Sequence, residues 1–126
     1  MAHTIVNSAQ APTPVGPYNH AVLAQGVLYV SGQIALDTAG NFHNQDIRTE
    51  TTQVMRNLAA ILEAAGMNWS NVVKCSIFLR DLNDYVAVNE VYGSFFTEQA
   101  PAREAMQVVR LPKDANVEIS CIAVQS

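Results

Sequence analysis

The strongest constraint on the fold is a helical apolar period between Asp46 and Gly66 that is flanked on both sides by strand-like segments. Asp46 is a good N-cap residue, and Gly66 can end the helix in the left-handed conformation. The apolar positions recur at helical spacing and give one face to bury: Ile47, Thr51, Val54, Leu58, Ile61, Leu62 and Ala65. The chain must therefore supply a second layer against which this helix packs.

Alternating apolar residues predict strands before and after that helix. A stretch with three prolines and a glycine, residues 8–18, separates the first two strands and should be irregular. The pair Gln25-Gly26 predicts a tight hairpin, and Ser31-Gly32-Gln33 is expected to interrupt its second strand where a ligand could approach the backbone. The predicted strands are residues 3–7, 21–25, 27–31 and 71–79, followed by AREAMQVV and VEISCIAV near the C-terminus.

A second helix is predicted to begin at Asp81 or Asn83 and to run to about Gln99, before Pro101. Its shared face carries Tyr85, Asn89, Tyr92 and Phe96, so Asn89 is either a satisfied core amide or a site residue. The resulting order, β-β-β-α-β-α-β-β, predicts one α+β domain over residues 1–126, with both helices on one face of a mixed β-sheet.

Composition narrows the function classes. The chain has a formal net charge of −4 and its seven basic residues are scattered, so no nucleic acid partner is expected. Only 14% of residues are charged, which predicts that apolar surface is covered by another copy of the chain. No apolar run approaches a membrane span and the N-terminus does not resemble a signal peptide, so a soluble, cytoplasmic protein without membrane contact is expected.

No cofactor is expected, because the sequence holds no phosphate loop, dinucleotide fingerprint or G-x-S-x-G motif. No metal is expected either, since His3, His20 and His43 lack ligand spacing and fall in different elements. Cys75 and Cys121 lie within apolar alternations and are expected to be buried thiols rather than a disulfide.

Two charged residues stand inside the C-terminal strand-like runs, Arg103 and Glu118. They could be a structural ion pair and a solvent-facing carboxylate, or they could bind a carboxylate and activate a water. In a plain hairpin about residues 111–116 they would lie on the order of 20 Å apart, too far for one small substrate. Either the last strand is inserted elsewhere in the sheet, or another subunit completes the site.

The ordered motifs resemble the RidA (YjgF) family of imine and enamine deaminases over nearly the whole chain. The motifs are GPYNHAV at 16–22, LYVSGQI at 28–34, TTQVMRNLAAILEAAG at 51–66, VVKCSIFLRDLNDYVAVNEVY at 72–92, and PAR, AMQV and RLPKDANVEI near the C-terminus. The resemblance implies a chorismate-mutase-like fold and a homotrimer with sites between subunits. It also implies that Arg103 binds the substrate carboxylate and that Glu118 positions or deprotonates water.

The same resemblance places Tyr18, Ser31, Asn89 and the backbone of Gly32 in the substrate cleft. Their alternative roles are a loop-anchoring tyrosine, a strand-end serine and a core amide. The implied activity is cofactor-independent hydrolysis of 2-aminoacrylate, 2-iminopropanoate and 2-iminobutanoate to 2-oxo acids and ammonia. A non-catalytic module that binds small carboxylates or acts as a holdase remains an alternative, as does an endoribonuclease or translation inhibitor, which the acidic charge disfavours.

The sequence departs from the family pattern beside the arginine. Ala105 stands where many members carry a cysteine, which excludes a nucleophilic or regulatory thiol at that position. Glu104 is larger and more acidic than the small residue common there, and strand alternation should direct it away from the pocket. Both changes leave the exact substrate open.

Overall fold

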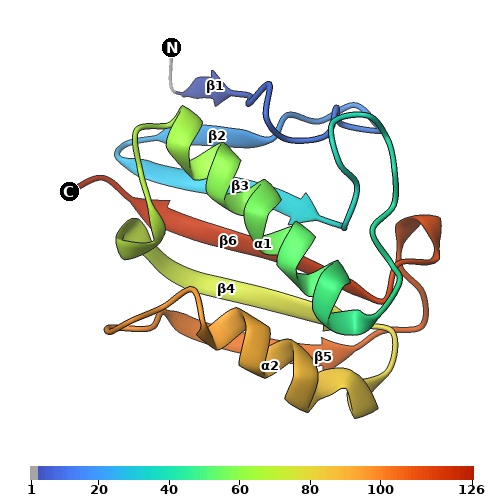
Figure 1. Cartoon of the computed structure of the whole chain (residues 1–126). Coiled ribbons are helices and arrows are strands. Elements are labelled where there is room, and N and C mark those ends of the chain that lie inside the picture. Colours follow the sequence, from blue (N-terminus) through green and yellow to red (C-terminus); the bar gives the residue numbers. More distant parts are fainter. Residues whose placement is uncertain (1–2) are drawn as a thin grey trace.

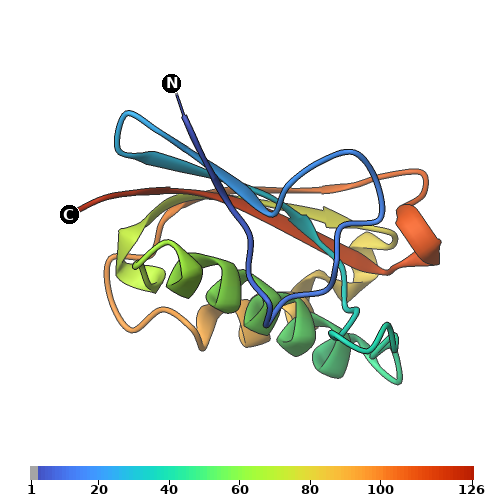
Figure 2. The same cartoon turned by 90° about the horizontal axis from the view of Figure 1, so that it is seen from above.

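The computed structural model describes residues 3–126, which form a six-stranded sheet with two helices on one face (Figure 1). The strands are β1 Thr4–Val6, β2 Ala21–Ala24, β3 Val27–Gln33, β4 Val72–Leu79, β5 Ala102–Gln107 and β6 Val117–Val124. The helices are α1 Ile47–Ala64 and α2 Tyr85–Gly93. Viewed from above, both helices lie on the same side of the sheet, as the sequence predicted (Figure 2).

The strand order is β1-β2-β3-β6-β4-β5, so the last strand is inserted between β3 and β4. It is antiparallel to both neighbours, whereas β5 pairs with β4 in parallel at the edge of the sheet. The plain C-terminal hairpin is therefore excluded and the mixed sheet is confirmed. The central place of β6 agrees with its sequence, because Val117, Ile119, Cys121 and Ala123 are all buried beneath the helices.

Helix α1 begins and ends where the sequence predicted. The Asp46 side chain accepts a hydrogen bond from the Thr49 amide at 2.8 Å, and Gly66 adopts a φ of 71° just past the C-cap. Its fully buried residues include Val54, Leu58 and Leu62, which form the centre of the core between α1 and the sheet.

Helix α2 is shorter than predicted, because it ends at Gly93 rather than near Gln99. Phe95 and Phe96 leave the helix and pack edge-on against Trp69, with ring centroids 5.7 and 5.2 Å apart. At the other end, Asp81 caps a 3-10 turn over residues 82–84 that precedes α2, through a hydrogen bond from the Asn83 amide. Tertiary aromatic packing therefore decides the end of this helix, where sequence periodicity alone would continue it.

The sequence predicted that Ser31-Gly32-Gln33 would interrupt β3, and this prediction is wrong. Strand β3 runs through to Gln33, and the irregularity is a shift in its register against β6 between Val30 and Gln33. This bulge lies opposite the start of β6, and so it brings Gly32 against the side chain of Glu118.

On the face of the sheet away from the helices, several apolar side chains are exposed in the described part of the chain, residues 3–126. Tyr29 on β3, Met106 on β5 and Val124 on β6 are 51%, 39% and 37% exposed. The helices of residues 3–126 include none that is long and apolar enough to cross a bilayer. Within the same residues, no group of three or more His, Cys, Asp or Glu side chains is placed to hold a metal ion.

Candidate active site

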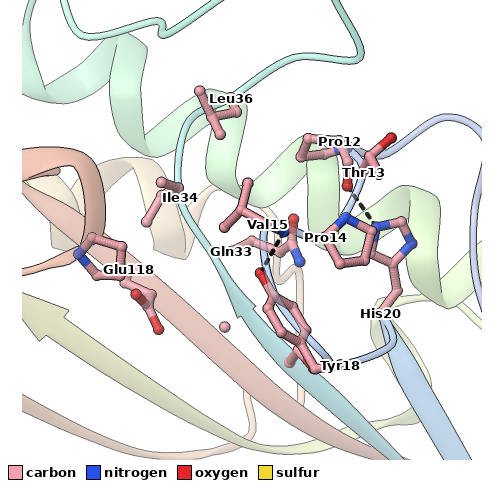
Figure 3. A pocket seen from close by; sticks show the side chains of 13 residues that line it. Pro12, Thr13, Pro14, Val15, Tyr18, His20, Gln33, Ile34, Leu36 and Glu118 are labelled. Atoms are coloured by element: carbon pink, nitrogen blue, oxygen red, sulfur yellow. Dashed lines mark hydrogen bonds between the residues drawn. The ribbon is translucent and has the colours of Figure 1, made fainter. Parts of the chain in front are cut away.

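A cavity of about 380 Å³ lies between the proline-rich loop before β2, the end of β3 and the start of β6 (Figure 3). Its apolar wall consists of Pro12, Pro14, Val15, Ile34, Leu36 and Pro112, and its polar groups come from Thr13, Tyr18, His20, Ser31, Gln33 and Glu118. A mostly apolar cavity with a few convergent polar groups is the usual form of a small-molecule site.

Glu118 projects from β6 into this cavity, where it is half-buried over Gly32. A Cβ atom at position 32 would overlap Oε2 of Glu118 and would lie 2.9 Å from Cδ and 3.1 Å from Cγ. Glycine is therefore required for this side chain to lie where it does. Burial raises the pKa of Glu118 above its ordinary value, which makes its carboxylate a better proton acceptor near neutral pH.

His20 anchors the loop that forms one wall of the cavity. Its Nδ1 accepts the Ser8 amide hydrogen at 3.0 Å, so Nε2 carries the ring hydrogen and donates it to the Pro12 carbonyl at 2.6 Å. The ring is 2% exposed. A neutral, buried imidazole with both nitrogens bonded acts here as a brace for the loop.

Tyr18 and Ser31 line the cavity, and both also hold the loop. The Tyr18 hydroxyl accepts the Val15 amide hydrogen at 3.4 Å, while its ring stays 44% exposed (Figure 3). Ser31 donates its hydroxyl hydrogen to the Asn19 carbonyl at 2.7 Å. Tyr18 therefore anchors the loop and also lines the cavity.

Arg103 lies elsewhere, against one face of α2. Its Nη1 donates to Asn89 Oδ1 at 2.5 Å and its Nη2 donates to Tyr85 Oη at 2.6 Å. The guanidinium carbon also lies 5.5 Å from the centre of the Tyr85 ring and 5.1 Å from that of Tyr92. Asn89 is exposed rather than buried, so it is not a core amide.

The positive charge of Arg103 has no anionic partner among residues 3–126, where the four ion pairs involve other groups. Burial raises the pKa of both neighbouring acidic groups, the Tyr92 phenol and the Cys75 thiol, and thus keeps them neutral. Both Cys75 and Cys121 are free and buried, as the sequence predicted. Arg103 on β5 lies directly opposite Cys75 on β4, so its side chain is on the same, helix-facing side of the sheet as the Cys75 side chain.

The two charged residues thus occupy opposite faces of the same sheet. Glu118 pairs in register with Phe78 on β4, and Arg103 pairs with Cys75 on the far side of β4. Three residues along the strand and two strand spacings across it separate their backbones by about 14 Å. Within one chain, the structure unites Glu118 with Tyr18, Ser31 and Gly32, and Arg103 with Asn89, as two separate groups.

Glu104 lies on the opposite strand face from Arg103, as predicted. Its carboxylate accepts the Ser76 hydroxyl hydrogen at 2.8 Å and lies 3.5 Å from Lys74 Nζ. The Ser76 hydrogen bond, followed by the Lys74 charge, lowers the pKa of Glu104. It therefore remains ionised on the open face, apart from the Arg103 group.

Sequence reasoning missed several residues that the structure places in these groups, Tyr85, His20 and Gln33 among them. Tyr85 contacts Arg103, whereas His20 and Gln33 lie at the Glu118 cavity. The signal for Tyr85 was present, because it precedes Asn89 by one helical turn on the same aromatic face. His20 and Gln33 fall inside conspicuous motifs, but nothing in their local pattern shows which side of the sheet they face.

Comparison with known proteins gives matches over nearly the whole chain. The family model described as endoribonuclease L-PSP matches residues 8–125. A RutC family protein of Synechocystis is 50% identical over 127 residues, covering 98% of both chains. The 2-iminobutanoate/2-iminopropanoate deaminase of Capra hircus is 44% identical, covering 99% of this chain and 92% of its own.

A solved structure agrees with both sequence comparisons. The conserved Rid family protein YyfA of Yersinia pestis superposes with a TM-score of 0.95 at 37% identity, over 98% of this chain and all of its own. The function of that protein is not known. The α+β arrangement of one sheet and two helices is therefore common to this chain and to Rid structures.

Proposed function

Because this chain belongs to the RidA (YjgF) family, we propose that it is a cofactor-independent deaminase of reactive enamines and imines derived from small 2-amino acids. The observation that carries the proposal is the pair of complementary groups: a half-buried carboxyl with a raised pKa in a cavity, and an arginine without an anionic partner. Relatives named 2-iminobutanoate/2-iminopropanoate deaminase support the substrate class.

The chemistry needs only a positioned water and a held substrate. The enamine 2-aminoacrylate tautomerises to 2-iminopropanoate, whose carbon–nitrogen double bond is electrophilic at carbon. Glu118 takes a proton from water as the oxygen attacks this carbon and passes it to the imine nitrogen. The resulting amino alcohol then gives its hydroxyl proton to nitrogen through the same carboxylate and expels ammonia to leave pyruvate. Arg103 holds the substrate carboxylate through its planar fork, with Asn89 fixing the guanidinium. Tyr18, Ser31 and the Gly32 backbone shape the cleft around the imine.

Arg103 and Glu118 can meet on one small substrate only if they come from different copies of the chain, since they lie on opposite faces of one sheet. We therefore place the active sites between subunits of a homotrimer. The apolar open face, where Tyr29, Met106 and Val124 are exposed, supplies the surface that the neighbouring copies would cover.

Complementation tests the shared site directly. Arg103→Ala and Glu118→Ala should each be inactive, but co-expressed in equal amounts they should regain about a quarter of the parent activity, because that share of interfaces pairs two intact residues. Sedimentation equilibrium of the same sample should report three chains per particle. A mixture that stays inactive although mixed particles form, or a stable monomer at micromolar concentration, would contradict the shared site.

The activity itself is tested by generating 2-aminoacrylate with a serine or threonine dehydratase and following pyruvate formation with and without this protein. Faster release of pyruvate identifies a deaminase. An unchanged rate together with saturable binding of 2-oxobutanoate would favour the alternative of a non-catalytic carboxylate-binding module. An unchanged rate with cleavage of an RNA substrate would favour the endoribonuclease alternative.

The two charged residues should fail in different ways. Arg103→Lys keeps the charge but loses the planar fork, so binding and turnover should both weaken by roughly 10- to 150-fold. Glu118→Gln should leave 2-oxobutanoate binding nearly intact while lowering turnover by roughly 100-fold or more, because an amide cannot take the proton from water. Calorimetric titration with 2-oxobutanoate and the coupled assay measure the two effects. Parent-like binding by Arg103→Lys, or parent-like turnover by Glu118→Gln, would show the roles to be wrong.

A further inference from the structure

The Arg103 group contains a hydroxyl whose hydrogen is not used. Tyr85 opens α2 and Asn89 follows one turn later, so both side chains reach Arg103 from the same helical face. Tyr85 is 38% exposed, and Arg103 is half-buried between the Tyr85 and Tyr92 rings. The group therefore opens to solvent on one side and rests on aromatic rings on the other.

The direction of each hydrogen bond follows from the chemistry of the guanidinium, which has five donor hydrogens and no acceptor. In its contacts with Arg103, the Tyr85 oxygen must accept and so must the Asn89 oxygen. The hydroxyl hydrogen of Tyr85 therefore points away from the arginine, and no group of residues 3–126 accepts it. The amide hydrogens of Asn89 and three guanidinium hydrogens also remain available.

The arginine thus occupies one lone pair on each neighbouring oxygen, and hydrogen-bond donors make up most of what the group presents to solvent. A carboxylate has two oxygens with about four lone-pair sites and no donor of its own, so it complements such an array. A neutral ester or amide has fewer acceptor sites and no charge with which to strengthen them.

From this geometry we infer that Tyr85 is a further substrate-binding residue, which donates its hydroxyl hydrogen to the same carboxylate that Arg103 binds. The inference rests on the proposed function, since it concerns the carboxylate subsite of that reaction. It predicts selection for free 2-imino and 2-oxo acids over their esters. It also gives α2 two tasks, to hold the guanidinium and to contribute a donor beside it.

The test compares Tyr85→Phe with a hydroxyl deletion on α1, Thr52→Val, at a side chain whose hydroxyl bonds the Arg48 carbonyl of the same helix. Calorimetry with 2-oxobutanoate should show binding weakened by roughly 10-fold or more in Tyr85→Phe and unchanged in Thr52→Val. Binding of the methyl ester should be equally weak in all three proteins. In the coupled assay, Tyr85→Phe should raise KM by a similar factor with kcat nearly unchanged, as expected when binding is lost uniformly.

A second variant separates donation to the substrate from support of Arg103. Site-specific 3-fluorotyrosine in place of Tyr85, at a pH where its phenol is protonated, is a stronger donor and a weaker acceptor than tyrosine. Tighter 2-oxobutanoate binding is expected if the hydroxyl donates to the carboxylate, and weaker binding if it only accepts from Arg103. The weaker result would overturn the inference, as would parent-like binding by Tyr85→Phe or an equal loss of ester binding.

These outcomes are distinct from failure of the proposed function. A parent protein that hydrolyses 2-aminoacrylate and binds 2-oxobutanoate, beside a Tyr85→Phe variant that matches it, would refute the inference alone. A parent that neither binds nor turns over would refute both.

Discussion

Replacing Gly32 with alanine should slow catalysis while leaving the fold in place. The added Cβ would overlap Oε2 of Glu118 and would lie 2.9 Å from its Cδ, so the carboxyl must retreat by about 0.5 Å at Cδ to reach the 3.4 Å of ordinary contact. The obstacle is a side chain rather than backbone, so rotation of Glu118 can relieve it at a cost of roughly 1–3 kcal/mol of overpacking. A displacement approaching 1 Å at a reacting group costs about 100-fold in rate.

The matched control is Gly93→Ala, because a Cβ at the end of α2 meets no atom within 4 Å and the backbone there needs no positive φ. In the coupled dehydratase assay, Gly32→Ala should lower kcat by roughly 10- to 100-fold, whereas Gly93→Ala should match the parent. Chemical denaturation should show both variants folded. If Gly32→Ala turned over at the parent rate while folded, the position of Glu118 over Gly32 would have no bearing on the reaction.

Three further predictions follow from buried groups. Burial raises the pKa of Glu118, so its ionisation as the pH rises destabilises the folded state. Glu118→Gln should therefore increase the free energy of unfolding at neutral pH. This gain should vanish below pH 4.5, the ordinary pKa of a glutamate, where the carboxyl is protonated in both states. Equal pH profiles for parent and variant in urea titrations would contradict it. Glu50 is fully buried and accepts the Asn116 amide and side-chain hydrogens at 2.7 and 2.8 Å. Glu50→Gln should lower the free energy of unfolding by about 1–3 kcal/mol, because its NH2 group would face an N–H donor of Asn116. The double variant Glu50→Gln with Asn116→Asp should recover most of this loss in the same urea titration. Since Cys75 and Cys121 are 0% and 3% exposed, with thiol pKa values raised by burial, iodoacetamide should leave native activity unchanged; rapid loss of activity with modification of either thiol would place it on the wrong face.

The candidate site was only partly predictable from sequence. The residues carried over from the family resemblance fall into two groups that are coherent in space, one around Glu118 and one around Arg103. Alternation within each strand shows which residues share a face. It does not show which face of one strand matches which face of another, because that relation depends on pairing and register. For the same reason Tyr85 was recognised as part of an aromatic face but not as a partner of Arg103.

The sequence by itself determined the local elements. Asp46 and Gly66 mark the ends of α1, and Gln25-Gly26 marks the hairpin between β2 and β3, because capping and turn conformations depend on the residues at those positions. The alternation of Val117, Ile119 and Cys121 likewise determined that β6 has one buried face. These signals depend on residues a few positions apart, so they can be recognised without knowing how the rest of the chain folds.

Only the tertiary structure decided where β6 lies and where α2 ends. The same alternation in β6 would suit a hairpin with β5 or a place between β3 and β4, and the inserted position is selected because it buries the apolar face of β6 beneath the helices. Helix α2 ends at Gly93 because Phe95 and Phe96 gain more by packing on Trp69 than by continuing the helix. Both outcomes rest on contacts between residues far apart in sequence, and such contacts leave no local pattern from which to read them.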